Sequence, residues 1–285
     1  MKHDKEKLII EKFVLILIVL VAIITLLARA SLHSIRSSLP VFVLNKLPAP
    51  VISFAPQNEM AKDVHIQALS QTSRQWLVAI SALLSYINHE SLDTLNPGLG
   101  TNTTQSLLKE WWEITDRASA IKQLEWLKTE GHTAQFEEVH KVVTHFANND
   151  EEYNSKKETL TQFIYSERDK KSLIYLFDFV WKHRNDLAIK KLYAWDYMRM
   201  VSVARWSYAA GYLSEDEAWQ YLLYAGKNLQ KLYGSWKELG DNYVLGRTFW
   251  LADGYHPEYT ETIQWLTTSL SSPWQKIPWN TDLSR

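Results

Sequence analysis

Asp196, Arg199 and Arg205 are the charged residues that follow the two initial lysines in the largely apolar segment from Lys190 to Ala210, which reads KKLYAWDYMRMVSVARWSYAA. Asp196 and Arg199 are three residues apart and share one helical face, whereas Arg205 points to the roughly opposite side. Because burying an ion without a partner costs several kcal/mol, each group must meet an opposite charge or line a wet cleft. We weigh a structural ion-pair network against a pocket in which Asp196 is an acid or base and the arginines bind an anion.

A second polar segment, DNYVLGR, places Tyr243 and Arg247 four residues apart on one helical face, with Asp241 at its start. Gly246 permits close backbone approach, so it is either a packing notch or part of a cleft shared with Asp196. A hydrolase that pairs Asp196 with Asp241 would need their carboxyl groups about 5 to 9.5 Å apart across that cleft. The residues considered as partners for the charges of the apolar helix are Asp116, Arg117, Glu217, Asp241 and Arg247.

The common catalytic and cofactor signatures are absent from the sequence. It contains no cysteine, which excludes disulfides, thiolate nucleophiles and Cys-ligated metals. Glu137 and His140 form a single E-x-x-H pair, whereas a di-metal site in a helical bundle needs two such pairs. There is no H-E-x-x-H, no Gly-rich phosphate loop and no G-x-S-x-G. We therefore expect no metal and no cofactor, and the sequence leaves open whether the protein is an enzyme.

The 13 tryptophans admit two interpretations, a core of aromatic side chains or a platform that stacks on sugars or peptides. Most of them fall within amphipathic helical patterns, where an aromatic side chain usually packs in the core. Trp274 and Trp279 lie in the proline-punctuated segment SSPWQKIPW. We expect them to latch the carboxyl terminus onto the domain, the alternative being that they remain available for binding.

Beyond residue 60 the apolar spacing is helical almost throughout, without a convincing strand pattern or repeat. Ser214 and Glu217 form a capping box, and Thr115 or Asp116 can cap a helix that ends at Gly131. The predicted fold class is therefore all-α, a compact multi-helix domain behind one N-terminal transmembrane helix. The predicted helices cover about 71–88, 115–131, 134–147, 156–190, 190–210 and 215–233.

Four sequence blocks occur in a fixed order: WWEITDRASAIKQLEWL, AWDYMRMVSVARWSYAAGYLSEDEAW, GSWKELGDNYVLGRTFW and SPWQKIPW. Together they resemble the bacterial domain-of-unknown-function family 1266, over about Trp76 to Trp279. The resemblance implies an α-helical domain without an assigned activity, and it transfers no catalytic residue. Residues 1–60 depart from the usual soluble form of that family.

The N-terminal region predicts attachment to a membrane. Residues 13–28 are apolar except for Thr25 and follow a short tail that contains four lysines. As a helix this run rises about 24 Å against a hydrocarbon core of roughly 30 Å, so flanking lysines would have to snorkel. Ala28-Arg29-Ala30 also fits a signal-peptidase site, so cleavage after Ala30 is the alternative. We favour the anchor because the run is slightly long for a signal peptide and cleavage would place Arg29 in the recognition tripeptide.

This reading divides the chain into a cytoplasmic tail (1–12), a transmembrane anchor (13–30), a proline-containing stalk or strap (31–60) and a helical domain (61–285). The four lysines before the apolar run outnumber Arg29 and Arg36 after it. This bias places the amino terminus in the cytoplasm. We therefore expect a single-pass protein of the bacterial inner membrane whose main domain is periplasmic.

The charge balance and the predicted anchor together limit the possible functions. A net charge of -1 without a Lys/Arg stripe offers no footprint for nucleic acid. The expected partners are the lipid bilayer, through residues 13–28, and another protein of unknown identity. We interpret the chain as a membrane-anchored, protein-binding helical domain of the bacterial envelope, with a periplasmic hydrolase using Asp196 and Asp241 as the alternative. A purely structural role, with the anchor serving oligomerisation, is a third possibility.

Overall fold

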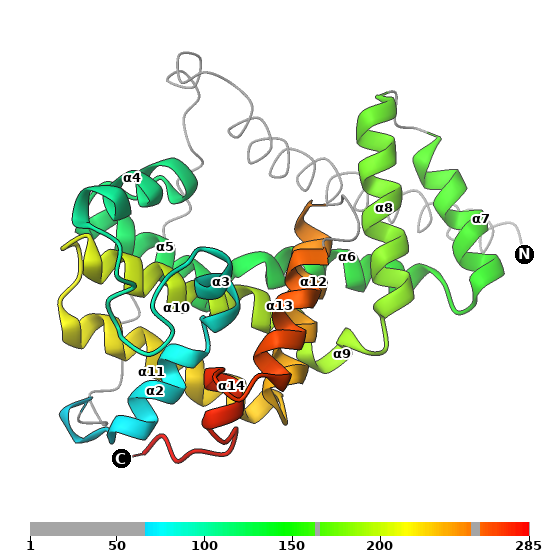
Figure 1. The fold of residues 1–285 in the computed structure, drawn as a ribbon. Helices are drawn as coiled ribbons and strands as arrows, with labels where there is room; N and C mark the ends of the chain where they lie inside the picture. Colours follow the sequence, from blue (N-terminus) through cyan, green and yellow to red (C-terminus); the bar gives the residue numbers. More distant parts are fainter. Residues whose placement is uncertain (1–65, 163–165, 252–256, 285) are drawn as a thin grey trace, which may run out of the picture. The chain divides into compact units, whose positions relative to one another are not determined.

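The computed structural model describes residues 66–162, 166–251 and 257–284, and every regular element within these ranges is a helix (Figure 1). The all-α prediction is confirmed for this part of the chain. No helix in these ranges is both long and apolar enough to cross a bilayer. The predicted tail (1–12), anchor (13–30) and stalk (31–60) lie outside the described residues.

The described residues fall into two compact units. The first unit contains residues 138–162 and 166–181, and the second contains 66–137, 182–251 and 257–284. The division falls inside two helices, α6 (Gly131–Phe146) and α8 (Glu167–His183). Because a helical pattern continues across each division point, the sequence contains no linker that would reveal it.

In the first unit, aromatic and polar side chains join α7 (Asp150–Thr161) to α8. The rings of Tyr153 and Trp181 stack with centroids 4.6 Å apart. The indole Nε1 of Trp181 donates to Asp150 over 2.8 Å, and the Tyr153 hydroxyl donates to Asp178 over 2.7 Å. The predicted helix over 156–190 is wrong, because this range holds parts of three helices: α7, α8 and α9 (Leu187–Lys190). In addition, α7 begins earlier than predicted, in the polar segment capped by Asn149. An N-cap and an acidic first turn stabilise that start without any apolar periodicity.

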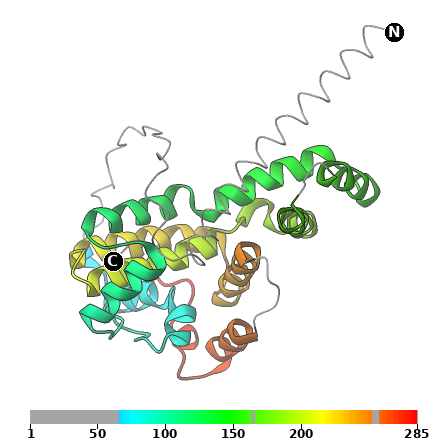
Figure 2. The ribbon, with the colours of Figure 1, turned by 90° about the horizontal axis from the view of Figure 1, so that it is seen from above.

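The second unit is built around α10 (Tyr193–Ala209), which packs against four helices, α4, α5, α11 and α12 (Figures 1 and 2). Every residue from 194 to 207 is buried, as expected from the apolar character of this segment. The other elements of the unit are η1 (Ile66–Ala68), α2 (Gln71–Ala79), α3 (Ala82–Ile87), α4 (Thr101–Trp112), α5 (Arg117–Thr129), α9 (Leu187–Lys190), α11 (Glu215–Leu232), α12 (Trp236–Leu251), α13 (Pro257–Thr268) and α14 (Pro273–Lys276).

Capping side chains set several helix boundaries. Asp116, and not Thr115, caps α5, and the predicted Ser214–Glu217 capping box is confirmed at the start of α11. The predicted helix over 71–88 is wrong, because the chain breaks into α2 and α3 near Ser81. No sequence signal predicted α13. Its threonine-rich sequence has weak helix propensity, so the helix depends on packing against α3, α12 and α14.

Candidate functional site

The carboxylate of Asp196 lies at the amino-terminal end of α6. It accepts hydrogen bonds from the backbone N–H groups of His132 and Thr133 over 2.9 and 2.8 Å. These donors have no partner within their own helix, and the helix dipole favours a negative charge at this end. Gly131, where α6 begins, has a φ of +55°, and a Cβ there would lie 2.3 Å from the Asp196 carboxyl carbon. Only glycine therefore allows Asp196 to approach so closely.

Arg199 completes a buried ion pair with Asp196. Its Nη2 donates to Asp196 Oδ1 and to His132 Nδ1, each over 2.8 Å, and its Nε donates to the Trp195 carbonyl. Since arginine can only donate, His132 Nδ1 is the acceptor in this contact. The guanidinium also lies 4.0 Å from the Trp195 ring centroid and 5.6 Å from that of Trp112. The predicted shared face of Asp196 and Arg199 is confirmed, and the two residues are ion-pair partners of each other rather than of the other charged residues considered.

This arrangement seals the Asp196 carboxylate from solvent, with 1% of the residue exposed. Burial raises the pKa of Asp196, but hydrogen bonding from His132 and the positive charge of Arg199 outweigh that effect and leave the pKa below its ordinary value. An ionised, enclosed carboxylate has neither the proton nor the access that a general acid needs. Asp196 therefore holds α6 against α10, which is the structural interpretation of this charge.

Arg205 lies elsewhere in the core, with 0% exposure, and clamps the loop between α3 and α4. Its donors reach five neutral oxygens, which belong to the side chains of Ser81 and Ser85 and to the carbonyls of Ser91, Thr94 and Leu95. The expectation that Arg205 either meets an opposite charge directly or lines a wet cleft therefore does not hold. A guanidinium fork can be satisfied by carbonyl and hydroxyl oxygens when they surround it.

The carboxylate of Glu90 is connected to Arg205 through one intervening hydroxyl group, that of Ser85. Ser85 accepts from Arg205 over 2.6 Å and donates to Glu90 over 3.1 Å. Glu90 also accepts from the indole Nε1 of Trp206 over 2.8 Å. Burial lowers the pKa of Arg205 to about 10, against the opposing effects of Glu90 and Asp93, so it stays charged at neutral pH.

The other expected partners of these charges pair elsewhere. Arg117 and Glu217 form an ion pair with each other between α5 and α11. Asp241 lies exposed on α12, where its carboxylate accepts from Lys237 over 2.6 Å. An exposed carboxylate and a sealed one do not form the paired acids of a glycosidase cleft. The arrangement of Asp196 and Asp241 thus gives the hydrolase alternative no support.

The remaining candidates on α12 surround its contact with α10. A Cβ on Gly246 would lie 2.2 Å from the Cβ of Trp195, so this glycine is the packing notch that its position suggested. Tyr243 is buried with its ring centroid 5.0 Å from that of Trp195. Arg247 does not tether a carboxylate in the described part of the chain, and its guanidinium lies 4.3 Å from the Tyr259 ring centroid.

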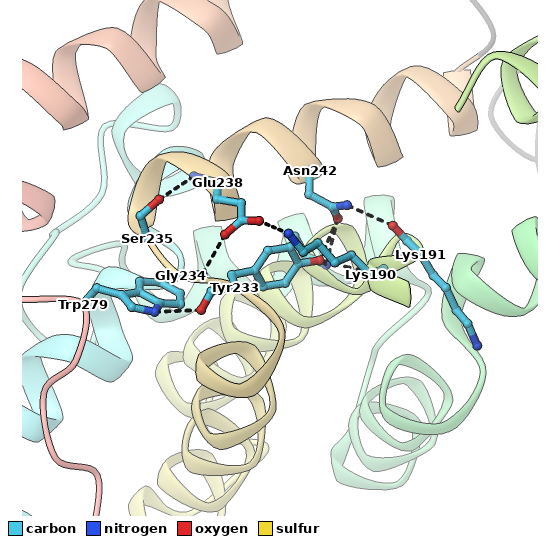
Figure 3. Close-up of polar contacts among 9 residues, drawn as sticks. Lys190, Lys191, Tyr233, Gly234, Ser235, Glu238, Asn242 and Trp279 are labelled. Atoms are coloured by element: carbon cyan, nitrogen blue, oxygen red, sulfur yellow. Dashed lines mark hydrogen bonds and ion pairs between the residues drawn. The ribbon is translucent and has the colours of Figure 1, made fainter. Parts of the chain in front are cut away.

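A third polar cluster joins the start of α10 to α12 (Figure 3). The Tyr233 hydroxyl accepts from the Ala194 N–H over 3.1 Å and donates to Asn242 Oδ1 over 2.9 Å. Asn242 Nδ2 donates to the carbonyl of Lys191, a residue with a φ of +45°. Figure 3 also shows the ion pair of Lys190 with Glu238. These contacts satisfy an orphan N–H of α10 and fix its start, and we assign them a structural role.

Four tryptophans latch the carboxyl terminus onto the second unit, which confirms the role predicted for Trp274 and Trp279. Their rings lie 4.8 to 5.6 Å apart in neighbouring pairs. Each indole N–H also donates to a backbone carbonyl over 2.8 to 2.9 Å. The four donors are Trp76, Trp236, Trp274 and Trp279, and the acceptors are Trp279, Ile277, Ala79 and Tyr233, respectively.

No group of three or more His, Cys, Asp or Glu side chains is placed to hold a metal ion within the described ranges. Of the E-x-x-H pair, Glu137 forms an ion pair with Lys191. His132 and Trp195 belong to the cluster around Asp196 and Arg199, although they were not among the predicted site residues. Gly131 was the available signal, because it ends one helix directly before another begins. The first N–H groups of the second helix then lack partners within that helix and can bind an acceptor.

Comparison with known proteins identifies one relationship. The family described as "Protein of unknown function (DUF1266)" matches residues 107–279. No curated protein and no solved structure matches the chain. The matched range contains Asp196, Arg199, Arg205 and the α12 residues discussed above, whereas residues 1–65 lie outside it.

Proposed function

The chain belongs to the family of proteins of unknown function DUF1266, and we propose that it is a single-pass membrane protein whose helical domain binds another protein. Membership of this family assigns no activity to the chain. The apolar run at 13–28 supports the anchor, and the lysine bias supports a periplasmic domain at a bacterial inner membrane. Binding is preferred to catalysis because the charges that might have formed an active site either seal one another or clamp the fold.

One exposed side chain carries the binding proposal. Trp111 on α4 is 70% exposed, although its neighbour Trp112 turns inward to within 6.5 Å of Trp206. Leu107, four residues earlier, lies on the same helical face and is partly exposed. Tryptophan is enriched among the residues that dominate protein interfaces, because its large ring gains much free energy when it is desolvated. A solvated indole on a rigid helix is therefore a natural anchor for a partner.

The proposal is tested by placing a photo-crosslinking amino acid at position 111 of the full chain in its native cells. We expect one discrete adduct that is absent when the same group replaces Lys231, an exposed position on α11. Once the partner is identified, Trp111→Ala is expected to weaken binding by about 30-fold or more, as for an interface hot spot. Equal adducts at both positions, or unchanged affinity in Trp111→Ala, would contradict the proposal.

The membrane arrangement has its own test. A reporter that is active on only one side of the membrane, fused after Arg285, is expected to report the periplasm. Recovery of the native chain as a soluble species that begins at Ser31 would instead establish cleavage and remove the anchor.

A further inference from the structure

The ring of Trp111 and the carboxylate of its neighbour Glu110 are both left open near the end of α4. Trp111 is 70% exposed, and within residues 66–162, 166–251 and 257–284 no cation lies over its ring. Glu110 is exposed too, and its carboxylate forms no ion pair in the same ranges. A flat apolar ring and an unpaired carboxylate are therefore consecutive side chains on a rigid helix.

The core of the second unit shows what such a pair binds. On α10, the guanidinium carbon of Arg199 lies 4.0 Å from the ring centroid of Trp195. The same guanidinium lies 2.8 Å from the carboxylate of Asp196, the residue that follows Trp195. Consecutive indole and carboxylate side chains on a helix can therefore hold one arginine between them, with the ring against its face and the acid at its edge.

A second example joins α2 to α11. The guanidinium carbon of Arg74 lies 5.0 Å from the ring centroid of Trp219, and its Nη1 lies 3.5 Å from the carboxylate of Glu215, one turn earlier in α11. The indole Nε1 of Trp219 donates to the same carboxylate over 3.0 Å. This site is at the surface, so the combination binds arginine in a solvated setting as well as in the core.

The charges around Trp111 also favour a cation. Residues 109–116 contain one cation, Lys109, and three carboxylates, a net charge of -2; the carboxylates are those of Glu110, Glu113 and Asp116. Hydrogen bonds from Ser119 lower the pKa of Asp116, which keeps it ionised at neutral pH. Lys109 is two residues from Trp111, and side chains at that spacing do not face each other on a helix. The next cation, Arg117, is already paired with Glu217.

We propose that Trp111 and Glu110 bind an arginine side chain of the partner protein, an inference that rests on the protein-binding function proposed above. The guanidinium stacks on the indole and its edge donates to Glu110. Glu110 precedes the tryptophan, whereas Asp196 follows one, but its side chain is one methylene longer and reaches further. Arginine fits better than lysine, because an ammonium group has no flat face to stack and no fork for a carboxylate.

The test uses the full chain in a nonionic detergent with ¹⁵N-labelled tryptophan indoles, and Trp111→Phe assigns the Trp111 resonance. The probe is an acetylated and amidated peptide of Gly-Arg repeats. We expect it to shift the Trp111 resonance saturably. The matched peptide of Gly-citrulline repeats, which has nearly the same shape but no charge, is expected to leave the resonance unchanged, and the Gly-Lys peptide to bind more weakly than the arginine peptide.

Two variants connect the shift to the carboxylate. Glu110→Gln is expected to weaken binding of the arginine peptide by about two- to fivefold, as for an exposed ion pair, and Glu110→Lys by more. Glu261→Gln removes an exposed carboxylate from α13 and changes the net charge equally, so it is the matched control and leaves binding unchanged. The other indole resonances report whether each variant is folded.

Three results would overturn the arginine site. These are equal shifts with the arginine and citrulline peptides, tighter binding of the lysine peptide, and equal losses of affinity in Glu110→Gln and Glu261→Gln. The photo-crosslink at position 111 is a separate measurement. An adduct without binding of the arginine peptide would preserve the protein-binding function and refute arginine recognition, whereas peptide binding without an adduct would do the reverse.

Discussion

Replacing Gly246 by alanine tests the contact on which the arrangement of α10 and α12 depends. The new methyl carbon would lie 2.2 Å from the Cβ of Trp195, whereas non-bonded carbons normally approach to about 3.5–4.0 Å. The two helices must then separate by more than about 1 Å. Overpacking costs typically 1–3 kcal/mol, and this clash lies at the upper end because a Cβ moves only with its backbone. Better helix propensity returns about 1 kcal/mol, so the net destabilisation is about 2 kcal/mol.

Gly240 in the same helix supplies the matched control. A Cβ at Gly240 would lie 3.1 Å from side-chain atoms of Ile263 and Trp274, which can yield by a few tenths of an ångström. Gly240→Ala is therefore expected to change the free energy of unfolding by no more than about 1 kcal/mol, with propensity and strain nearly cancelling. Both substitutions make the same chemical change in the same helix, so any difference between them comes from the neighbours.

Denaturant and thermal unfolding followed by tryptophan fluorescence measure this difference. A loss of about 2 kcal/mol corresponds to a Tm lower by about 4–8 °C for a domain of this size. Trp195→Phe should not rescue Gly246→Ala, because phenylalanine retains the Cβ that clashes. The reasoning is refuted if Gly246→Ala is no less stable than Gly240→Ala, or if Trp195→Phe restores stability.

Three further changes test the buried polar contacts. Asp196→Asn leaves Arg199 buried without a counter-ion and should lower the free energy of unfolding, measured with denaturant, by about 3–5 kcal/mol. The pKa of Asp196 is depressed in the folded state, so its contribution to stability is present above about pH 4 and is lost on further acidification. The variant should therefore lose less stability than the wild type when the pH is lowered. Arg205→Lys leaves at least two of five acceptors unpaired, costs about 2–4 kcal/mol and should speed amide hydrogen exchange in residues 91–95. Trp279→Phe removes the hydrogen bond to the Tyr233 carbonyl and should lower the free energy of unfolding by about 1–2 kcal/mol, whereas unchanged stability would argue against the latch.

Local sequence signals identified several contacts correctly. The three-residue spacing of Asp196 and Arg199 predicts their shared face, and the structure joins them over 2.8 Å. The S-x-x-E motif at Ser214 predicts the start of α11, and Gly246 predicts a close helix contact. Each of these properties depends on residues within about one helical turn, which is why the chain reveals them without a fold.

The partners of the buried charges were not predictable in the same way. Arg205 binds oxygens that lie 110 to 124 residues away in the sequence, and Asp196 binds backbone groups 63 and 64 residues away. Backbone N–H and carbonyl groups are the same in every residue, so no residue type marks them as acceptors or donors. Charge matching therefore proposed Glu217 and Asp241, which bind other side chains.

The amino-acid sequence by itself determined the helical class, the central position of α10, the capping of α5 and α11 and the family, because periodicity, caps and ordered blocks are local properties. Only the tertiary structure decided that Asp196 is enclosed, that Arg205 clamps a loop and that the guanidinium of Arg247 lies over the ring of Tyr259. The free energy of a buried charge depends on the groups that surround it. In this protein those groups are backbone and side-chain atoms that are distant in the sequence.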